Sequence, residues 1–297
     1  MTATETAVRL VERVRREAKR AAKKPDADGV HDLRVAIRRS RQCLAEFKEA
    51  LPEDTVRKAR KKMRKILRKA GPVRNIDVAR VLMKSVGARS GRQLSTDLSR
   101  ERAHLERELL RLVARFNEHD PAKGWVSKLR AKADDGQTPP GIEELPTRAA
   151  EYFDEGDRTA DPSTPVETLH SFRLKTKKFR YTLELYAGFY GPALKSRLES
   201  LRTVQEHLGA ISDCFTTLEL LSEHRDVDPA AVEKAVQAIR PQIDKHALAF
   251  RREWRTLFTS SERRAWLHFL EHERATVTQR RPASNANHPK ALAARTA

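Results

Sequence analysis

Apolar residues recur at three- and four-residue intervals along most of the chain, which is the spacing of an amphipathic helix. In the first such segment Val11, Val14 and Ala18 fall on one face. With proline, glycine and polar clusters taken as boundaries, the pattern predicts helices over residues 5–24, 31–51, 54–70, 93–118, 122–133, 143–156, 166–187, 192–208, 211–224, 229–258 and 261–273. We therefore expect an all-α protein. We also expect Gly71 and Pro72 to end the third helix and a short helix to follow them to about residue 86.

The helical pattern occurs twice, on either side of the polar segment 134–141. Residues 31–41 (HDLRVAIRRSR) match residues 170–180 (HSFRLKTKKFR) at an offset of 139, and residues 71–75 (GPVRN) match residues 209–213 (GAISD) at an offset of 138. Repetition at a fixed period indicates a duplicated structural unit. We predict a first helical half over residues 5–140 and a second over 141–273, each closing its own bundle. The polar remainder, 274–297, is typical of a disordered tail.

The composition agrees with long helices. Aromatic residues make up only 6% of the 297 residues, and the chain has 11 Gly and 14 Pro, which disfavours an all-β fold. No stretch is apolar enough to span a bilayer, and the first ten residues lack the apolar core of a signal peptide. Cys43 and Cys214 are the only cysteines, so we expect neither a disulfide scaffold nor a thiolate metal site. A reducing cytoplasm fits this pattern best.

The charge changes the picture more than the composition does. The chain carries 60 Lys and Arg against 41 Asp and Glu, a net charge of +19, and its pI is about 10.3. A chain this basic usually meets a polyanion: a nucleic acid, an anionic membrane or an inorganic phosphate polymer. Residues 1–140 hold 36 basic and 19 acidic side chains, whereas residues 141–297 hold 24 and 22. The first half should therefore supply most of the positive field at any shared site.

The repeated segment carries a stripe of basic residues led by a histidine. At about 100° per residue, four side chains of the first copy share one face that lies away from the apolar face: His31, Arg34, Arg38 and Arg41. The second copy repeats this stripe with His170, Arg173, Lys177 and Arg180, and both copies add a further base, at Arg39 and Lys178. Two copies in one register favour a ligand-binding role, although a solvated charged face is the common alternative.

The third predicted helix is the most basic part of the chain. Residues 57–69 contain nine bases and no acid, including Lys61, Arg64, Lys65 and Arg68. Like charges one helical turn apart repel each other, so a bound anion would stabilise this helix, while a solubilising surface helix is the alternative. Its counterpart, residues 195–207, is far less basic, and the candidate anion ligand that we select there is Arg202, which stands among glutamates.

These residue types suit phosphate. Arginine offers a planar fork of donors for two-point contact, and lysine offers a mobile point charge. A histidine among so many cations should be neutral in the empty site and become protonated when phosphate binds. We therefore expect binding to tighten as the pH falls from about 8 to 6, around the ordinary pKa of histidine.

The duplicated motif resembles the CHAD domain, the conserved-histidine α-helical domain, over about residues 5–273. It does so through the two histidine-led segments and through the glycine-containing segments before residues 75–77 and 212–213. The resemblance implies two four-helix bundles with approximate two-fold symmetry, a basic cavity between them, binding of inorganic polyphosphate and association with polyphosphate granules.

Carried over by position, the resemblance implicates His31, Arg34, Arg38, Arg41, His170, Arg173, Lys177 and Arg180. It adds Lys61, Arg64, Lys65, Arg68 and Arg74 from the basic third helix and the segment after it. The sequence departs from the family pattern at Phe215, where the first half has Asp77, and it has lysine at both 177 and 178.

Other functions fit the sequence less well. No phosphate-binding loop, dinucleotide fingerprint or HExxH motif is present, so we expect no enzyme and no cofactor. A metal site at His31 and His170 would be repelled by the surrounding cations, and the basic helices lack an aromatic membrane anchor. Nucleic acid is the stronger rival because the charge permits weak, non-specific binding, but few aromatic residues are available for base stacking. The sequence leaves the oligomeric state open.

Overall fold

The computed structural model describes residues 2–88, 91–132 and 139–279, and every regular element in these ranges is helical. The first five helices are α1 (Ala3–Lys23), α2 (Ala27–Glu46), α3 (Glu53–Ser85), α4 (Arg92–His119) and α5 (Pro121–Ala131). The remainder are η1 (Ile142–Glu144), α6 (Leu145–Ala160), α7 (Thr168–Tyr190), η2 (Gly191–Ala193), α8 (Leu194–Glu223), α9 (Pro229–Leu257) and α10 (Ser260–Gln279). The all-α prediction is confirmed.

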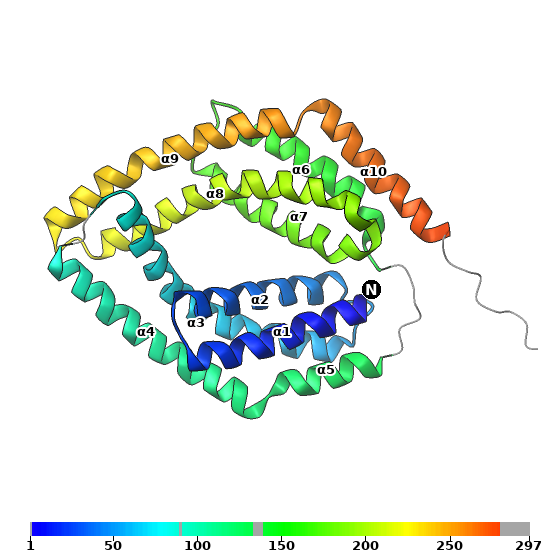
Figure 1. Ribbon diagram of the computed structural model, residues 1–297, viewed down its shortest axis with the longest axis horizontal. Coiled ribbons are helices and arrows are strands. Elements are labelled where there is room, and N and C mark those ends of the chain that lie inside the picture. Colours follow the sequence, from blue (N-terminus) through cyan, green and yellow to red (C-terminus); the bar gives the residue numbers. More distant parts are fainter. Residues whose placement is uncertain (1, 89–90, 133–138, 280–297) are drawn as a thin grey trace, which may run out of the picture.

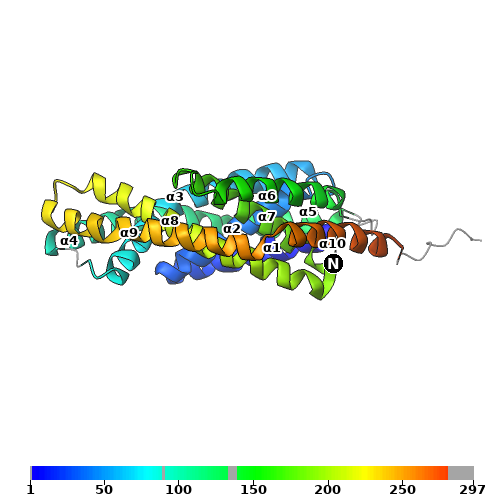
Figure 2. The same ribbon diagram turned by 90° about the horizontal axis from the view of Figure 1, so that it is seen from above.

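The helices form two groups that follow the order of the chain (Figure 1). In one group α1 packs against α2, α4 and α5, and in the other α6 packs against α7, α9 and α10. The groups meet where α3 contacts α8 and α9 and where α2 contacts α7. Turned by 90°, the molecule is a flat, elongated slab (Figure 2). The predicted boundary at residue 140 falls between α5 and η1, and four-helix bundles related by two-fold symmetry stay a prediction.

Aromatic packing fixes the second group. Trp254 of α9 stacks on Phe258 with ring centroids 4.2 Å apart, and Tyr152 of α6 packs edge-on against Trp254 at 5.5 Å. Gly156 of α6 makes this possible, because a Cβ there would come within 1.9 Å of the Trp254 ring. Trp266 is also buried. The core of this group therefore depends on large rings placed against one another with a glycine at the point of closest approach.

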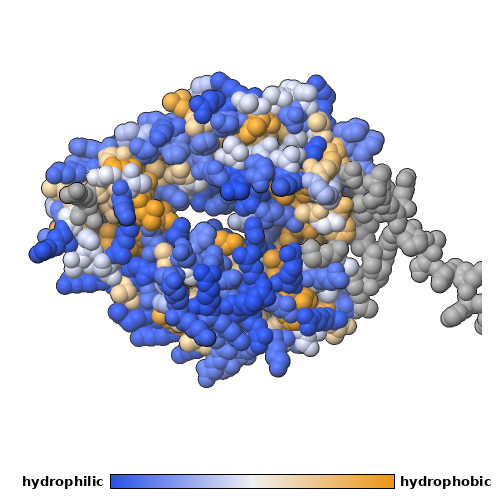
Figure 3. All heavy atoms as spheres, in the orientation of Figure 1, coloured by the Kyte–Doolittle hydropathy of each residue, from blue (hydrophilic) through white to orange (hydrophobic). Residues whose placement is uncertain are grey.

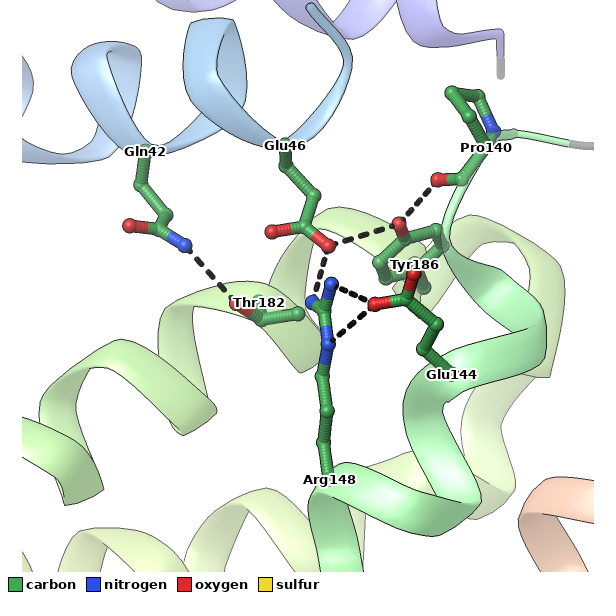
Figure 4. A network of polar contacts seen from close by, with 7 residues as sticks. All are labelled: Gln42, Glu46, Pro140, Glu144, Arg148, Thr182 and Tyr186. Atoms are coloured by element: carbon green, nitrogen blue, oxygen red, sulfur yellow. Dashed lines mark hydrogen bonds and ion pairs between the residues drawn. The ribbon is translucent and has the colours of Figure 1, made fainter.

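A polar network joins the two groups beside the α2–α7 contact (Figure 4). Glu46 of α2 is ion-paired with Arg148 of α6, and it accepts a hydrogen bond of 3.2 Å from the hydroxyl of Tyr186 on α7. Gln42 donates to the Thr182 hydroxyl at 3.1 Å. The Glu46 side chain is only 7% exposed, so its charge is compensated by these contacts rather than by water.

Several helix boundaries differ from the predictions. Gly71-Pro72 does not end the third helix, because α3 runs unbroken from Glu53 to Ser85 with Pro72 inside it. Gly209 does not interrupt α8 either. A helical proline costs a few kcal/mol, but buried Ala70, Val73 and Ile76 hold α3 on both sides of it. Tertiary packing thus outweighs the local signal for a break.

The helix ends differ by smaller amounts. α2 begins at Ala27, four residues before the predicted start, and the Asp26 side chain caps it by accepting a hydrogen bond from the Gly29 amide. α10 continues to Gln279, beyond the predicted end at residue 273. Residues 274–279 of the predicted disordered tail are therefore helical, while residues 280–297 of that tail and most of the predicted linker lie outside the described residues. Cys43 and Cys214 are both free and buried.

Candidate functional site

Basic side chains from both groups of helices converge where α2 and α3 approach α7. We call six of them the central cationic cluster: His31, Arg34 and Arg38 of α2, Arg74 of α3, and Arg173 and Lys177 of α7. The charges of Arg38, Arg74 and Arg173 all act on Arg34. Those of Arg173 and Arg38 act on Lys177. Arg34 and Arg38 of the first histidine-led stripe therefore lie near Arg173 and Lys177 of the second.

The cluster is partly withdrawn from water, and this shows in its acid–base properties. Burial, followed by the neighbouring arginine charges, lowers the pKa of Arg34 to about 10. Burial and the charges of Arg173 and Arg38 lower the pKa of Lys177 to about 7. Burial also lowers the pKa of Arg173, while nearby Asp213 opposes that shift. Desolvation and like-charge repulsion both disfavour the charged forms, so the empty cluster holds positive charge at a free-energy cost that a bound anion would relieve.

Donors in the cluster lack acceptors. The buried Nε–H of Arg173 has no hydrogen-bond partner among the described residues. The Arg34 guanidinium donates to the carbonyl oxygen of Leu67 on α3 at 3.4 Å, a long contact for such a donor. The hydrogen-bonding capacity of these two arginines is therefore not fully used within the protein. A space-filling view shows a hollow between the two groups of helices with a largely hydrophilic rim (Figure 3).

The two histidines lie at the exposed start of each stripe. Burial and the charge of Arg74 lower the pKa of His31, which is the direction expected from the sequence. His170 lies 3.2 Å from Ser212, measured from its Nδ1 to the hydroxyl oxygen. This contact joins the His170 ring to α8.

The structure adds Asp213 of α8, which sequence reasoning did not select. Its carboxylate lies 3.9 Å from the guanidinium of Arg173. Burial raises its pKa, against the opposing charges of Arg173, Lys177, Arg74 and His31. The repeat contained a signal for it, because Asp213 matches Asn75 of the first half. A carboxylate in place of an amide is the kind of difference that an alignment of the two halves exposes.

The basic face of α3 extends away from the cluster. Its predicted ligands are all exposed: Lys61, Arg64, Lys65 and Arg68. Arg41 of α2 lies beside this face, because the charges of Arg64 and Arg60 contribute, after burial, to lowering its pKa. Arg41 therefore belongs with α3 rather than with the central cluster.

Besides Arg41 and the exposed residues of α3, four more residues selected from sequence lie apart from the central cluster. Arg39 and Arg180 both pair with Glu184 and both lie over the Tyr181 ring. Lys178 lines a separate pocket with Glu155 and Phe179. Arg202 is exposed and paired with Glu199 and Glu206. A stripe that is continuous in sequence is thus divided among different surroundings.

The departure from the family pattern at Phe215 has a structural explanation. Its counterpart Asp77 is 6% exposed and accepts a hydrogen bond of 2.6 Å from Arg102 of α4. Asp77 therefore holds α3 to α4. Phe215, at the matching position of the second half, cannot form such an ion pair. Because Asp77 lies outside the central cationic cluster, this difference does not alter the cluster.

The described residues contain neither a set of metal ligands nor a membrane-spanning helix. No three His, Cys, Asp or Glu side chains there come together as a set of metal ligands. None of the described helices combines the length and apolar character that crossing a membrane requires.

Comparisons with known proteins agree on the fold. The sequence model of the CHAD domain family matches residues 6–222. The structure is similar to the CHAD domain from the plant Ricinus communis, with a TM-score of 0.61 and 18% identity over 90% of this chain and 92% of that one. It is also similar to PptA from Streptomyces chartreusis, with a TM-score of 0.60 and 17% identity over 84% of this chain and 99% of that one. A comparison with curated proteins finds no match.

Proposed function

This chain belongs to the CHAD domain family, and from that premise together with the central cationic cluster we propose that it binds inorganic polyphosphate without cleaving it. The observation that carries the proposal is the convergence of arginine and lysine side chains from α2, α3 and α7, close enough for their charges to contribute to the lowered pKa values of Arg34 and Lys177. A linear polymer with one negative charge on each internal phosphate matches such a line of cations.

Binding would involve many contacts along one chain. Phosphates in the central cluster would accept hydrogen bonds from the guanidinium groups of Arg34, Arg38 and Arg173. Further phosphates of the same polymer would bind the exposed lysine and arginine residues of α3, which lie next to Arg41. Because each added contact forms within an already bound chain, affinity should rise with polymer length until the basic surface is covered.

A titration with polyphosphates of graded length, beside triphosphate, ATP and DNA, tests the proposal. We expect affinity to rise steeply with polymer length and to fall with salt, since binding releases counterions. Equal affinity for triphosphate and for a long chain would contradict binding along a line of cations. Release of orthophosphate during incubation with Mg²⁺ would contradict a non-catalytic role.

The site assignment is tested by replacing Arg34, Arg38 and Arg173 together with alanine. We expect binding to weaken by several kcal/mol, because charged contacts contribute about 1.5–3 kcal/mol each. The matched control removes the same charge from three exposed, ion-paired arginines that lie outside the cluster: Arg130, Arg202 and Arg252. Equal losses in the two folded triple variants would show that only net charge matters.

Nucleic acid is a second candidate ligand, favoured by the exposed lysine and arginine residues of α3. Competition separates the two ligands: long polyphosphate should displace DNA at equal phosphate concentration. The reverse order would favour nucleic acid. The proposal extends to a cytoplasmic protein at polyphosphate granules, which imaging a fluorescent fusion against a polyphosphate stain would test.

A further inference from the structure

One carboxylate stands among the cations of the central cluster. Asp213 lies 3.9 Å from Arg173 and is acted on by the charges of Lys177, Arg74 and His31. These four groups come from α7, α3 and α2, so Asp213 faces both groups of helices. On its own helix, its neighbour Cys214 is a buried thiol. The carboxylate therefore occupies the same field that would attract a phosphate.

Asp213 is held loosely, unlike the structural carboxylates of this protein. Asp77 accepts a hydrogen bond of 2.6 Å from Arg102, and Glu46 is bound by Arg148 and Tyr186. The Asp213 carboxylate has only the 3.9 Å ion pair, with no hydrogen bond to it from any described residue. A pair at that distance carries little of the strength of a charge-assisted hydrogen bond, so the fold does not depend on this contact as it does on the other two.

We propose that Asp213 is an internal counter-anion that balances Arg173 in the empty site and competes with incoming phosphate. This inference rests on the proposed function and assigns a selectivity role within that site. An entering phosphate is repelled by the carboxylate or must displace it from Arg173, and a ligand meets this cost only when one of its phosphates lies beside Asp213. A long polyphosphate can bind along the exposed basic residues of α3 without filling that position, whereas triphosphate depends on the central cluster and bears the full cost. Asp213 thereby selects for length.

The test is Asp213→Asn, which places the amide of the first-half counterpart, Asn75, at this position. We expect the affinity for triphosphate to rise about tenfold, the change that about 1.4 kcal/mol produces. The gain for a long polyphosphate should be smaller, so that the preference for the long chain narrows. The matched control is Glu206→Gln, which removes one negative charge from an exposed, ion-paired position on the same helix.

Each outcome bears on the inference. Equal gains in triphosphate affinity in Asp213→Asn and Glu206→Gln would show a general charge effect and overturn the inference. Unchanged or weaker triphosphate binding by folded Asp213→Asn would overturn it as well. The failure of the proposed function looks different, because wild-type protein would then show no length-dependent polyphosphate binding at all. In that case thermal stabilisation by triphosphate, compared between wild type and Asp213→Asn, still measures whether Asp213 competes with anions.

Discussion

Lys177 should couple ligand binding to proton uptake. In the empty site, burial and the charges of Arg173 and Arg38 lower its pKa to about 7. A phosphate beside it favours the protonated form and should restore the pKa towards the ordinary lysine value of about 10.4. Lys177 is then largely neutral before binding and charged after binding at any pH between these two values, so one proton is taken up.

The sign and size of the effect follow from linkage. At pH 9 about one empty site in a hundred has a protonated Lys177, whereas at pH 7 about half do. Binding should therefore weaken as the pH rises, by at most about fiftyfold between pH 7 and pH 9. Below pH 7 this contribution levels off, and protonation of His31, whose pKa is lowered by burial and Arg74, adds to binding at still lower pH.

Calorimetry with long polyphosphate, in buffers of different ionisation enthalpy, measures the uptake directly. At pH 8 we expect about 0.9 proton per site from Lys177. The matched variant is Lys177→Arg, which keeps a positive charge throughout this range and should lose both the uptake and the pH dependence. The reasoning is refuted if wild-type protein takes up no proton at pH 8, or if Lys177→Arg takes up as many as wild type.

Three further predictions concern packing, the junction between the helix groups and the limits of the site. Gly156→Ala should lower the free energy of unfolding by about 2 kcal/mol or more, measured by urea denaturation, because its Cβ would overlap Trp254; unchanged stability would mean that α6 shifts freely. Glu46→Ala should lower the free energy of unfolding by about 1–2 kcal/mol in the same assay, since it removes the Arg148 ion pair between the helix groups, while Arg148 keeps Glu144 and the Tyr186 hydroxyl keeps the Pro140 carbonyl; a loss near zero would show that the network does not hold the helix groups together. Arg202→Ala should change the dissociation constant for polyphosphate by no more than about twofold, as for other exposed ion pairs, and a tenfold loss in a direct titration would place Arg202 in the site after all.

The sequence alone determined the helical architecture. Apolar side chains spaced at three and four residues can be buried together only on a helix, so the pattern predicted nearly every helix. The offset of 139 between the histidine-led segments also identified the two copies of the basic stripe. Both inferences depend on local geometry, which the order of residues fixes.

The continuity of α3 and α8 was decided by tertiary structure. Gly71-Pro72 and Gly209 are local signals for a break, yet both helices continue through them because their buried faces remain packed on both sides. Local propensity is worth a few kcal/mol at a proline, and burial of several side chains exceeds this amount.

Tertiary structure also decided which basic residues act together. A helical wheel gives the direction of a side chain on its own helix but not what stands opposite it. Arg38 and Lys177 meet in the cluster, whereas Arg39 pairs with Glu184 and Lys178 lines another pocket. The lowered pKa of Lys177 and the position of Asp213 among four cationic groups arise from burial and from charges on other helices. Such properties exist only once the two groups of helices are packed together, because Coulomb interactions and desolvation depend on distances through space.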